Sequence, residues 1–196
     1  MTKATATVAA MVTILTAGSA LRIDAASNPE LVVVVHVTDY AHISSRELAA
    51  AERVAARVYA AAGVRAIWTD GAERTPQPDR AFHIDVSLLS RDMVVQKCQT
   101  EGIEEGVFGR AASATKRAYI FYNRIVDRSV HTRVDVSRLL GMVLAHEIGH
   151  VLLPADSHSA SGIMRGTWEG RIVNVPNFTD DQGAAIRSLL AAVHAN

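Results

Sequence analysis

The feature that most constrains the fold is a long apolar helical pattern in the last third of the chain. Its apolar positions share one helical face: Val136, Leu139, Leu140, Val143, Leu144, Ile148, Val151 and Leu152. Asp135 stabilises the start of the pattern, and Pro154 ends it because proline lacks an amide donor. No charged residue lies between Arg138 and His146. The pattern therefore predicts a helix that lies in the interior.

The remaining periodicity predicts a mixed α/β sheet covered by helices. Strands are expected at 31–37, 64–68, 81–89 and 118–122, with a short exposed edge strand at 106–112. A helix begins after Ser44 or Ser45 and closes at Gly63, and a last helix begins near Thr179. The charged stretch 123–128 is expected to be a loop. The fold class is therefore α/β (α+β), with a mixed twisted sheet, a backing helix, a buried helix and a C-terminal helix.

The N-terminal residues have the order of a signal peptide. Lys3 precedes an uncharged stretch whose apolar centre runs from Val8 to Leu15, and small residues follow. We expect a signal peptide over 1–26 and a single domain over 27–196, with an uncleaved membrane anchor as the alternative. Cleavage follows either Ala20 or the Ala25–Ala26 pair. These features predict a secreted or periplasmic protein with no membrane span after cleavage.

Charge and cysteine content narrow the choice of partner and compartment. The chain has 20 Lys and Arg against 20 Asp and Glu, so no basic field favours nucleic acid or an anionic membrane. Cys98 is the only cysteine, which excludes an internal disulfide and a zinc site made of thiolates. An exported protein without disulfides suits a bacterial periplasm or exterior. Neither feature identifies an oligomeric state.

The buried helix pattern carries a motif of metal chemistry, His146-Glu147-Ile148-Gly149-His150. Residues four apart lie one turn above each other, so both imidazoles can reach one ion at about 2.0–2.1 Å. Glu147 lies one step round the helix, where it is placed to take a proton from a water at the metal. A catalytic zinc of this kind needs a third protein ligand and an open fourth position.

A family resemblance extends this motif over residues 143–164. The stretch from Val143 to Leu152, followed by Ser-His-Ser at 157–159 and Gly-Ile-Met at 162–164, resembles the active-site helix and Met-turn of metzincins, particularly the matrixins. The resemblance implies a zincin fold, a Zn²⁺ ion bound by His146, His150 and a third histidine, and Glu147 as general base and acid. It also implies that Met164 lies beneath the metal. Arg117 to Phe121 weakly resembles the family's upper subdomain.

The third ligand departs from the family's spacing. Metzincins place a glycine three residues after the second histidine and the third ligand three residues further on, where this chain has Leu153 and Asp156. His158 comes two residues later. The ligand is therefore either His158, after a two-residue insertion, or Asp156, as in the snapalysin-like branch that uses aspartate. We favour His158 because the tract around it resembles the matrixin ending.

These features together predict a secreted zinc-dependent endopeptidase that acts on a peptide or protein substrate. Two alternatives remain at this point. One is a secreted protein that binds zinc without turnover, and the shifted third ligand makes it reasonable. The other is a secreted binding domain in which the motif is accidental. Bound metal separates the second alternative from the others, and peptide hydrolysis separates the first.

Overall fold

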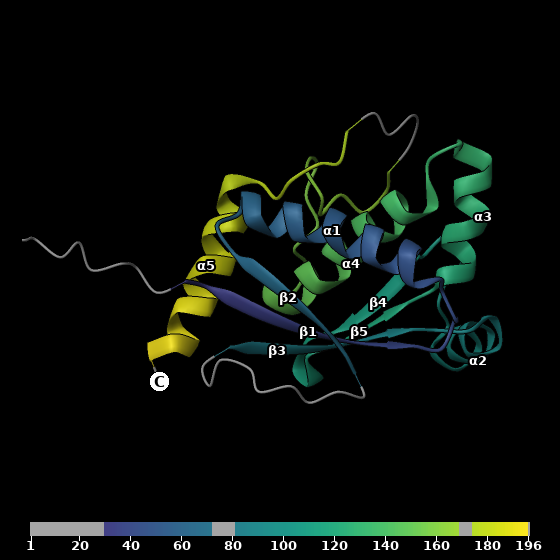
Figure 1. Ribbon diagram of the computed structural model, residues 1–196, viewed down its shortest axis with the longest axis horizontal. Coiled ribbons are helices and arrows are strands. Elements are labelled where there is room, and N and C mark those ends of the chain that lie inside the picture. The colour runs from purple at the N-terminus through teal and green to yellow at the C-terminus, as the bar shows by residue number, and fades with distance from the viewer. Residues whose placement is uncertain (1–29, 72–80, 169–173, 196) are drawn as a thin grey trace, which may run out of the picture.

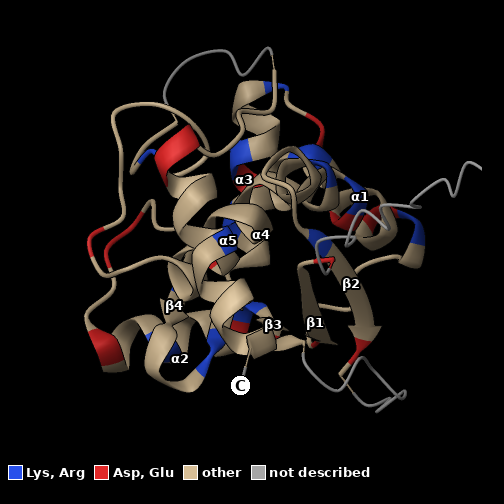
Figure 2. Ribbon diagram, turned by 90° about the vertical axis from the view of Figure 1, so that its left-hand side faces the viewer, with Lys and Arg blue, Asp and Glu red and all other residues tan. Residues whose placement is uncertain are grey.

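The computed structural model describes residues 30–71, 81–168 and 174–195 (Figure 1). The expected signal peptide, 1–26, lies outside the described residues, so the signal peptide and the domain boundary stay predictions. Among the described helices, none has both the length and the apolar character needed to cross a membrane. Basic and acidic residues are interspersed over the elements rather than gathered on one face in the view of Figure 2.

A five-stranded sheet forms the centre of the molecule, and its strand order is β2-β1-β3-β5-β4. The strands are β1 (Val32–Asp39), β2 (Arg65–Asp70), β3 (Phe82–Leu88), β4 (Gly109–Ala112) and β5 (Arg117–Ile120). All neighbours pair in parallel except β4, which is antiparallel to β5 and lies at the edge. The mixed sheet and its short edge strand confirm the predicted fold class.

Three helices pack on one face of the sheet: α1 (Ser45–Ala61), α4 (Val136–Leu152) and α5 (Asp180–Ala195) (Figure 1). They share one hydrophobic core with the inward-facing strand residues, such as Val35 and Ile84. Ser44 caps α1 by accepting a hydrogen bond from the Glu47 amide at 3.3 Å, which confirms the earlier of the two expected start points. The backing helix, the buried helix and the C-terminal helix are thus all present.

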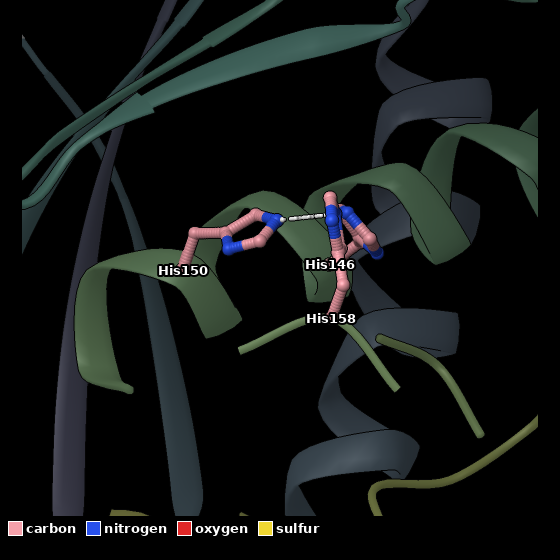
Figure 3. Close-up of side chains that lie close together, drawn as sticks. All are labelled: His146, His150 and His158. Atoms are coloured by element: carbon pink, nitrogen blue, oxygen red, sulfur yellow. Dashed lines mark hydrogen bonds between the residues drawn. The ribbon is translucent and has the colours of Figure 1, made fainter. Parts of the chain in front are cut away.

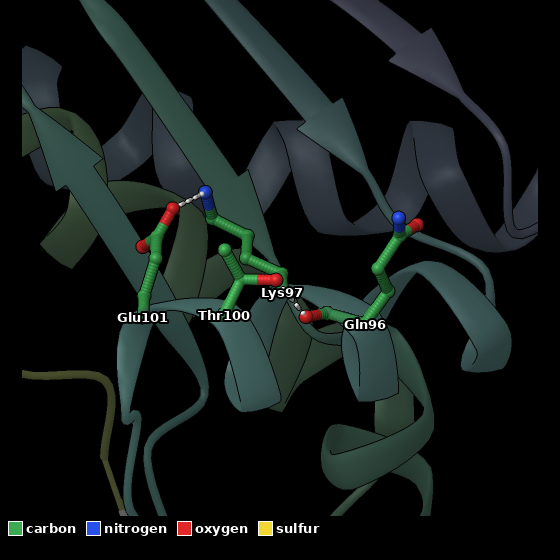
Figure 4. A network of polar contacts seen from close by, with 4 residues as sticks. All are labelled: Gln96, Lys97, Thr100 and Glu101. Atoms are coloured by element: carbon green, nitrogen blue, oxygen red, sulfur yellow. Dashed lines mark hydrogen bonds and ion pairs between the residues drawn. The ribbon is translucent and has the colours of Figure 1, made fainter.

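Two helices were not predicted from the sequence. The first is α2 (Arg91–Glu101), which packs on the opposite face of the sheet in a small cluster with Leu89 and Phe121. It buries little apolar surface and depends on local contacts: an N-cap at Ser90, a left-handed C-cap at Gly102, and polar contacts along its length. Lys97 pairs with Glu101 at 2.6 Å, and the Thr100 hydroxyl donates to the Gln96 carbonyl (Figure 4).

The second unpredicted helix is α3 (Tyr122–Thr132), and the expected loop at 123–128 is wrong. Asp127 is exposed and Arg124 and Arg128 are half-buried, while Ile125 is fully buried in the main core. One buried side chain in a charged stretch gives too weak a helical period to recognise. The helix lies beside α4 and so forms part of the same layer (Figure 1).

A close crossing of α1 and α4 sets how near the buried helix lies to its neighbour. A Cβ on Gly141 would lie 2.5 Å from the Ala51 carbonyl oxygen and 2.5 Å from the Val54 Cβ. These atoms belong to backbone and to a stiff β-branched side chain, so they cannot move aside cheaply. Only glycine at this position lets the two helices approach as they do.

We therefore expect Gly141→Ala to destabilise the protein, although alanine is the better helix former. Overpacking of this kind costs about 1–3 kcal/mol, which exceeds the gain of roughly 1 kcal/mol from helix propensity. Chemical denaturation measures the free energy of unfolding. Gly183→Ala in α5 is the control, because its Cβ would make ordinary contacts with Ala62, the nearest at 3.7 Å, and one tighter contact, 3.2 Å, with the far end of the long Arg187 side chain. Equal stabilities for the two variants would contradict the close crossing.

Candidate metal centre

The second half of α4 carries the residues of the motif. Asp135 caps the helix by accepting from the Arg138 amide at 3.0 Å, and Leu153 ends it in an extended conformation before Pro154. His146 and Glu147 are only 8% and 7% exposed. The apolar pattern of α4 therefore brings a histidine and a carboxyl group into the interior, where the free energy of charging them is high.

Three histidine rings converge at this point, His146 and His150 from α4 and His158 from the following loop (Figure 3). The His150 Nε2 lies 3.0 Å from the His146 Nε2 and 3.1 Å from the His158 Nε2. Three nitrogens bound to one tetrahedral ion at about 2.0–2.1 Å are separated from each other by about 3.3 Å. The observed separations are close to that value, so the three rings need only a small movement to share one ion.

Hydrogen bonds on the far side of the rings orient their lone pairs. The Nδ1 of His146 lies 2.8 Å from the Ile163 carbonyl oxygen, which can only accept, so this nitrogen carries the proton. Its Nε2 therefore presents a lone pair to the other two rings. The Nδ1 of His150 lies 3.1 Å from the Ser157 hydroxyl. Metal-binding histidines are typically held by such partners at the second ring nitrogen.

The charge state of the rings also suits a cation. Burial lowers the pKa of His146, and the Ile163 carbonyl opposes this shift. Burial, followed by the nearby His146 and His158, lowers the pKa of His150 to about 4. Both imidazoles are therefore neutral at pH 7, with lone pairs free to bind. A group of neutral imidazoles suits Zn²⁺ and related transition metals.

The structure places the two candidate third ligands differently. His158 joins the other two histidines, whereas Asp156 is exposed and does not belong to the ligand group found among the described residues. Asp156 has a positive φ of 60° in the turn that follows α4. His158 comes two residues after Asp156, and the turn accommodates this extra length while it carries His158 back over the helix.

Gln182 supports the loop that carries His158, and the sequence analysis did not identify it. Its side-chain amide donates to the Ser157 carbonyl and the Ser159 hydroxyl, both at 3.1 Å. Its Oε1 accepts from the Thr179 amide at 3.1 Å, and the Thr179 hydroxyl lies 3.4 Å from the Gln182 amide. Thr179 and Gln182 form a capping box, which a sequence can show. The contact with a loop more than twenty residues earlier has no such signal.

Glu147 lies beside the histidines under the edge strand. A Cβ on Gly109 of β4 would lie 2.6 Å from the Glu147 Cγ and 2.8 Å from its Oε1, so the strand backbone covers the carboxyl group directly. Burial raises the pKa of Glu147 to about 8, and the positive charge of Arg110 opposes the shift. A cation held by the histidines acts in the same direction as Arg110 and lowers this pKa toward neutrality. A carboxyl group in that range can both accept and donate a proton.

Met164 is fully buried below α4. Gly149 lies between the two ligand histidines of α4, and a Cβ on Gly149 would be 2.6 Å from the Met164 sulfur. The residue before it, Ile163, holds His146, and the Met164 carbonyl accepts from the Ser159 amide at 3.0 Å. The loop 159–164 therefore packs against the underside of the histidine group.

The contact between Gly109 and Glu147 leads to a test. We expect Gly109→Ala to displace the carboxyl group and to lower any activity that depends on it, because the new methyl group lies within 3 Å of three Glu147 atoms. A misplacement of about 1 Å can cost roughly 100-fold in rate. Metal content measured by atomic absorption should stay unchanged.

Gly166→Ala is the matched control for that variant. Its Cβ would lie 3.6 Å from the His158 Nδ1, an ordinary contact at the same site. We expect this variant to keep both metal and activity. If Gly109→Ala were as active as Gly166→Ala, the strand would not confine Glu147.

Comparisons with known proteins identify no family. Neither protein-family models nor curated proteins match the chain. A zinc-dependent peptidase from Methanocorpusculum labreanum (strain Z) shares 12% identity, covering 80% of this chain and 99% of that one, with a TM-score of 0.44. TM1509 from Thermotoga maritima shares 10% identity, covering 84% and 89%, with a TM-score of 0.37.

Proposed function

We propose that the protein is a zinc-dependent endopeptidase. One observation carries the proposal: three imidazole nitrogens converge within reach of a single ion, next to a buried glutamate that is not one of the converging groups. His146, His150 and His158 are the proposed ligands. Three neutral protein ligands leave the fourth position of a tetrahedral ion open, which is the pattern of catalytic rather than structural zinc sites.

Glu147 is the proposed general base and acid. A zinc ion in this site supplies positive charge that lowers the pKa of adjacent water and stabilises negative charge on a substrate carbonyl oxygen. Glu147 accepts the proton of the attacking water and then delivers it to the departing amine, which completes the hydrolysis. The apolar surroundings of the carboxyl group support this role, because they keep its pKa in the range where it can do both.

The edge strand β4 supports a polypeptide substrate. Its outer side has no strand neighbour in the described sheet, so an extended peptide can add to it through backbone hydrogen bonds. Because Gly109 lies over Glu147, a peptide on this edge passes close to the carboxyl group. Backbone pairing of this kind gives binding with little preference for sequence.

We further propose a metzincin-like arrangement and export from the cell. The packing of Met164 below the ligand helix supports its role as the methionine of a Met-turn. The order of charge and apolar residues before Ala26 supports a cleaved signal peptide and a secreted or periplasmic location. The catalytic domain is then 27–196.

A hydrolysis assay with metal removal and return tests the proposal. We expect purified protein to cleave a casein-like substrate or a peptide library, to lose this activity to a chelator, and to regain it with Zn²⁺. Bound zinc without any cleavage would instead support the non-catalytic zinc protein. Protein that neither contains zinc nor takes it up would show that the motif is accidental.

A further inference from the structure

A second pair of histidines lies on the sheet face that α4 does not cover. His36 of β1 and His83 of β3 alternate with Val35 and Ile84, whose side chains point into the main core. In the parallel register His83 is opposite Val34, so the two histidines are diagonal neighbours on one face. His36 is half-buried and His83 is exposed. Both rings are therefore accessible from outside the main core.

The two rings meet through their nitrogens. The His36 Nε2 lies 2.9 Å from the His83 Nδ1, the ring centroids are 5.2 Å apart, and the planes are 5° from parallel. The distance between the centroids exceeds the distance between the two nitrogens by about twice the radius of an imidazole ring. The two centroids and the two nitrogens therefore lie nearly on one line, so the rings meet edge to edge and share one proton between the nitrogens.

A third residue fixes the orientation of His36. The Thr69 hydroxyl of β2 donates to the Val35 carbonyl at 3.5 Å, which leaves its oxygen free to accept from the His36 Nδ1 at 2.8 Å. With the proton on Nδ1, the His36 Nε2 presents a lone pair toward His83. This partner at the second ring nitrogen is the arrangement that orients metal-binding histidines.

We propose that His36 and His83 form a second metal site, which takes one divalent transition-metal ion and binds Cu²⁺ most tightly. Two nitrogens bound to one ion at about 2.0–2.1 Å are separated by about 2.9–3.4 Å, which is near the separation already present. The exposed His83 ring turns so that its lone pair points at the ion beside the His36 Nε2. His83 remains a neutral imidazole: its proton moves from Nδ1 to Nε2, so that Nδ1 can bind the ion without net proton release, and water fills the other positions. We expect Cu²⁺ to bind most tightly because it has the highest affinity for imidazole sites among the divalent first-row transition metals.

Neighbouring charges set the strength of this site. Burial, His36 and Lys116 lower the pKa of His83, while Asp85 raises it, so the ring is available in its neutral form at pH 7. Lys116 also repels a bound cation, and Asp85 only partly offsets it because its carboxylate lies 3.7 Å from Arg117. With two protein ligands rather than three, the site binds more weakly than the histidine group on α4 and exchanges its ion readily.

Titration of zinc-loaded protein with Cu²⁺ tests this site. We expect the wild type to bind one equivalent of Cu²⁺ beyond any that exchanges with zinc on α4, with an electron paramagnetic resonance spectrum of nitrogen ligation. His83→Ala should lose this equivalent, and Thr69→Val should weaken it by about 10-fold because His36 loses its orientation. His131→Ala is the control, since His131 is exposed and its Nδ1 donates to the Asp127 carbonyl within its own helix.

The outcomes separate this site from the histidine group on α4. His158→Ala should leave the additional Cu²⁺ equivalent in place, and His83→Ala should leave peptide hydrolysis unchanged. Equal Cu²⁺ binding by wild type and His83→Ala, or no binding beyond that of the α4 histidines, would overturn the proposal. Circular dichroism of each variant shows whether the sheet is intact, so that a lost equivalent is not mistaken for unfolding.

Discussion

Replacing Glu147 by glutamine is expected to abolish peptide hydrolysis and to leave the bound zinc in place. Glutamine keeps the size of the side chain that lies under Gly109, so the local packing is retained. It cannot accept the proton of the attacking water, and a general base of this kind contributes about 10²–10⁴-fold to the rate. Steady-state kinetics and zinc analysis on the same preparation measure both parts of the prediction.

Glu101→Gln is the matched control for this substitution. It makes the same chemical change on the surface of α2, where Glu101 pairs with Lys97 in an exposed contact worth little free energy. We expect full activity and full zinc content. If Glu147→Gln retained activity, another group would perform the proton transfer. If it lost zinc, Glu147 would be a ligand rather than a base.

Replacing His158 by alanine is expected to remove most of the bound zinc, whereas Asp156→Ala should keep it. His158 contributes one of the three converging nitrogens, while the Asp156 carboxylate is exposed and separate from them. Loss of an outer hydrogen-bond partner already weakens zinc sites by about 10–100-fold, and loss of a ligand weakens them more. Competition with a chelating dye measures the affinity of each variant.

The same pair of variants distinguishes the two candidate third ligands. His158→Ala with wild-type affinity, together with a loss of zinc in Asp156→Ala, would assign the metal to the aspartate instead. Two affected variants would indicate that the turn itself is disturbed. In that case Ala155→Gly, which alters an exposed neighbour in the same turn, shows the effect of backbone change alone.

The sequence predicted the elements that bury many residues over a long stretch. The apolar face of α4 and the β-branched run of β1 are examples, because burial along a whole element leaves a period that can be read. The short edge strand β4 lies within the stretch 106–112 that was predicted from its glycines and polar residues, but it begins only at Gly109. The helices α2 and α3 were missed because they bury few side chains, Val94 in α2 and Ile125 in α3.

The site was partly readable for a related reason. His146 and His150 come from one helix, so their spacing alone places both rings on one face. The choice between His158 and Asp156 depends on the path of a turn, and the Gln182 contacts depend on how α5 packs. The pairing of His36 with His83 depends on the register of parallel strands, which no local pattern encodes.

Anomalous X-ray diffraction from crystals of zinc-loaded protein tests the central claim most directly. Data collected on both sides of the zinc absorption edge locate the ion without reference to any assumed ligand. We predict a zinc peak at about 2.0–2.1 Å from the Nε2 atoms of His146, His150 and His158, with the Glu147 carboxylate outside the coordination sphere. A peak bound by Asp156, a peak that includes Glu147 as a protein ligand, or no peak between the three rings would contradict it.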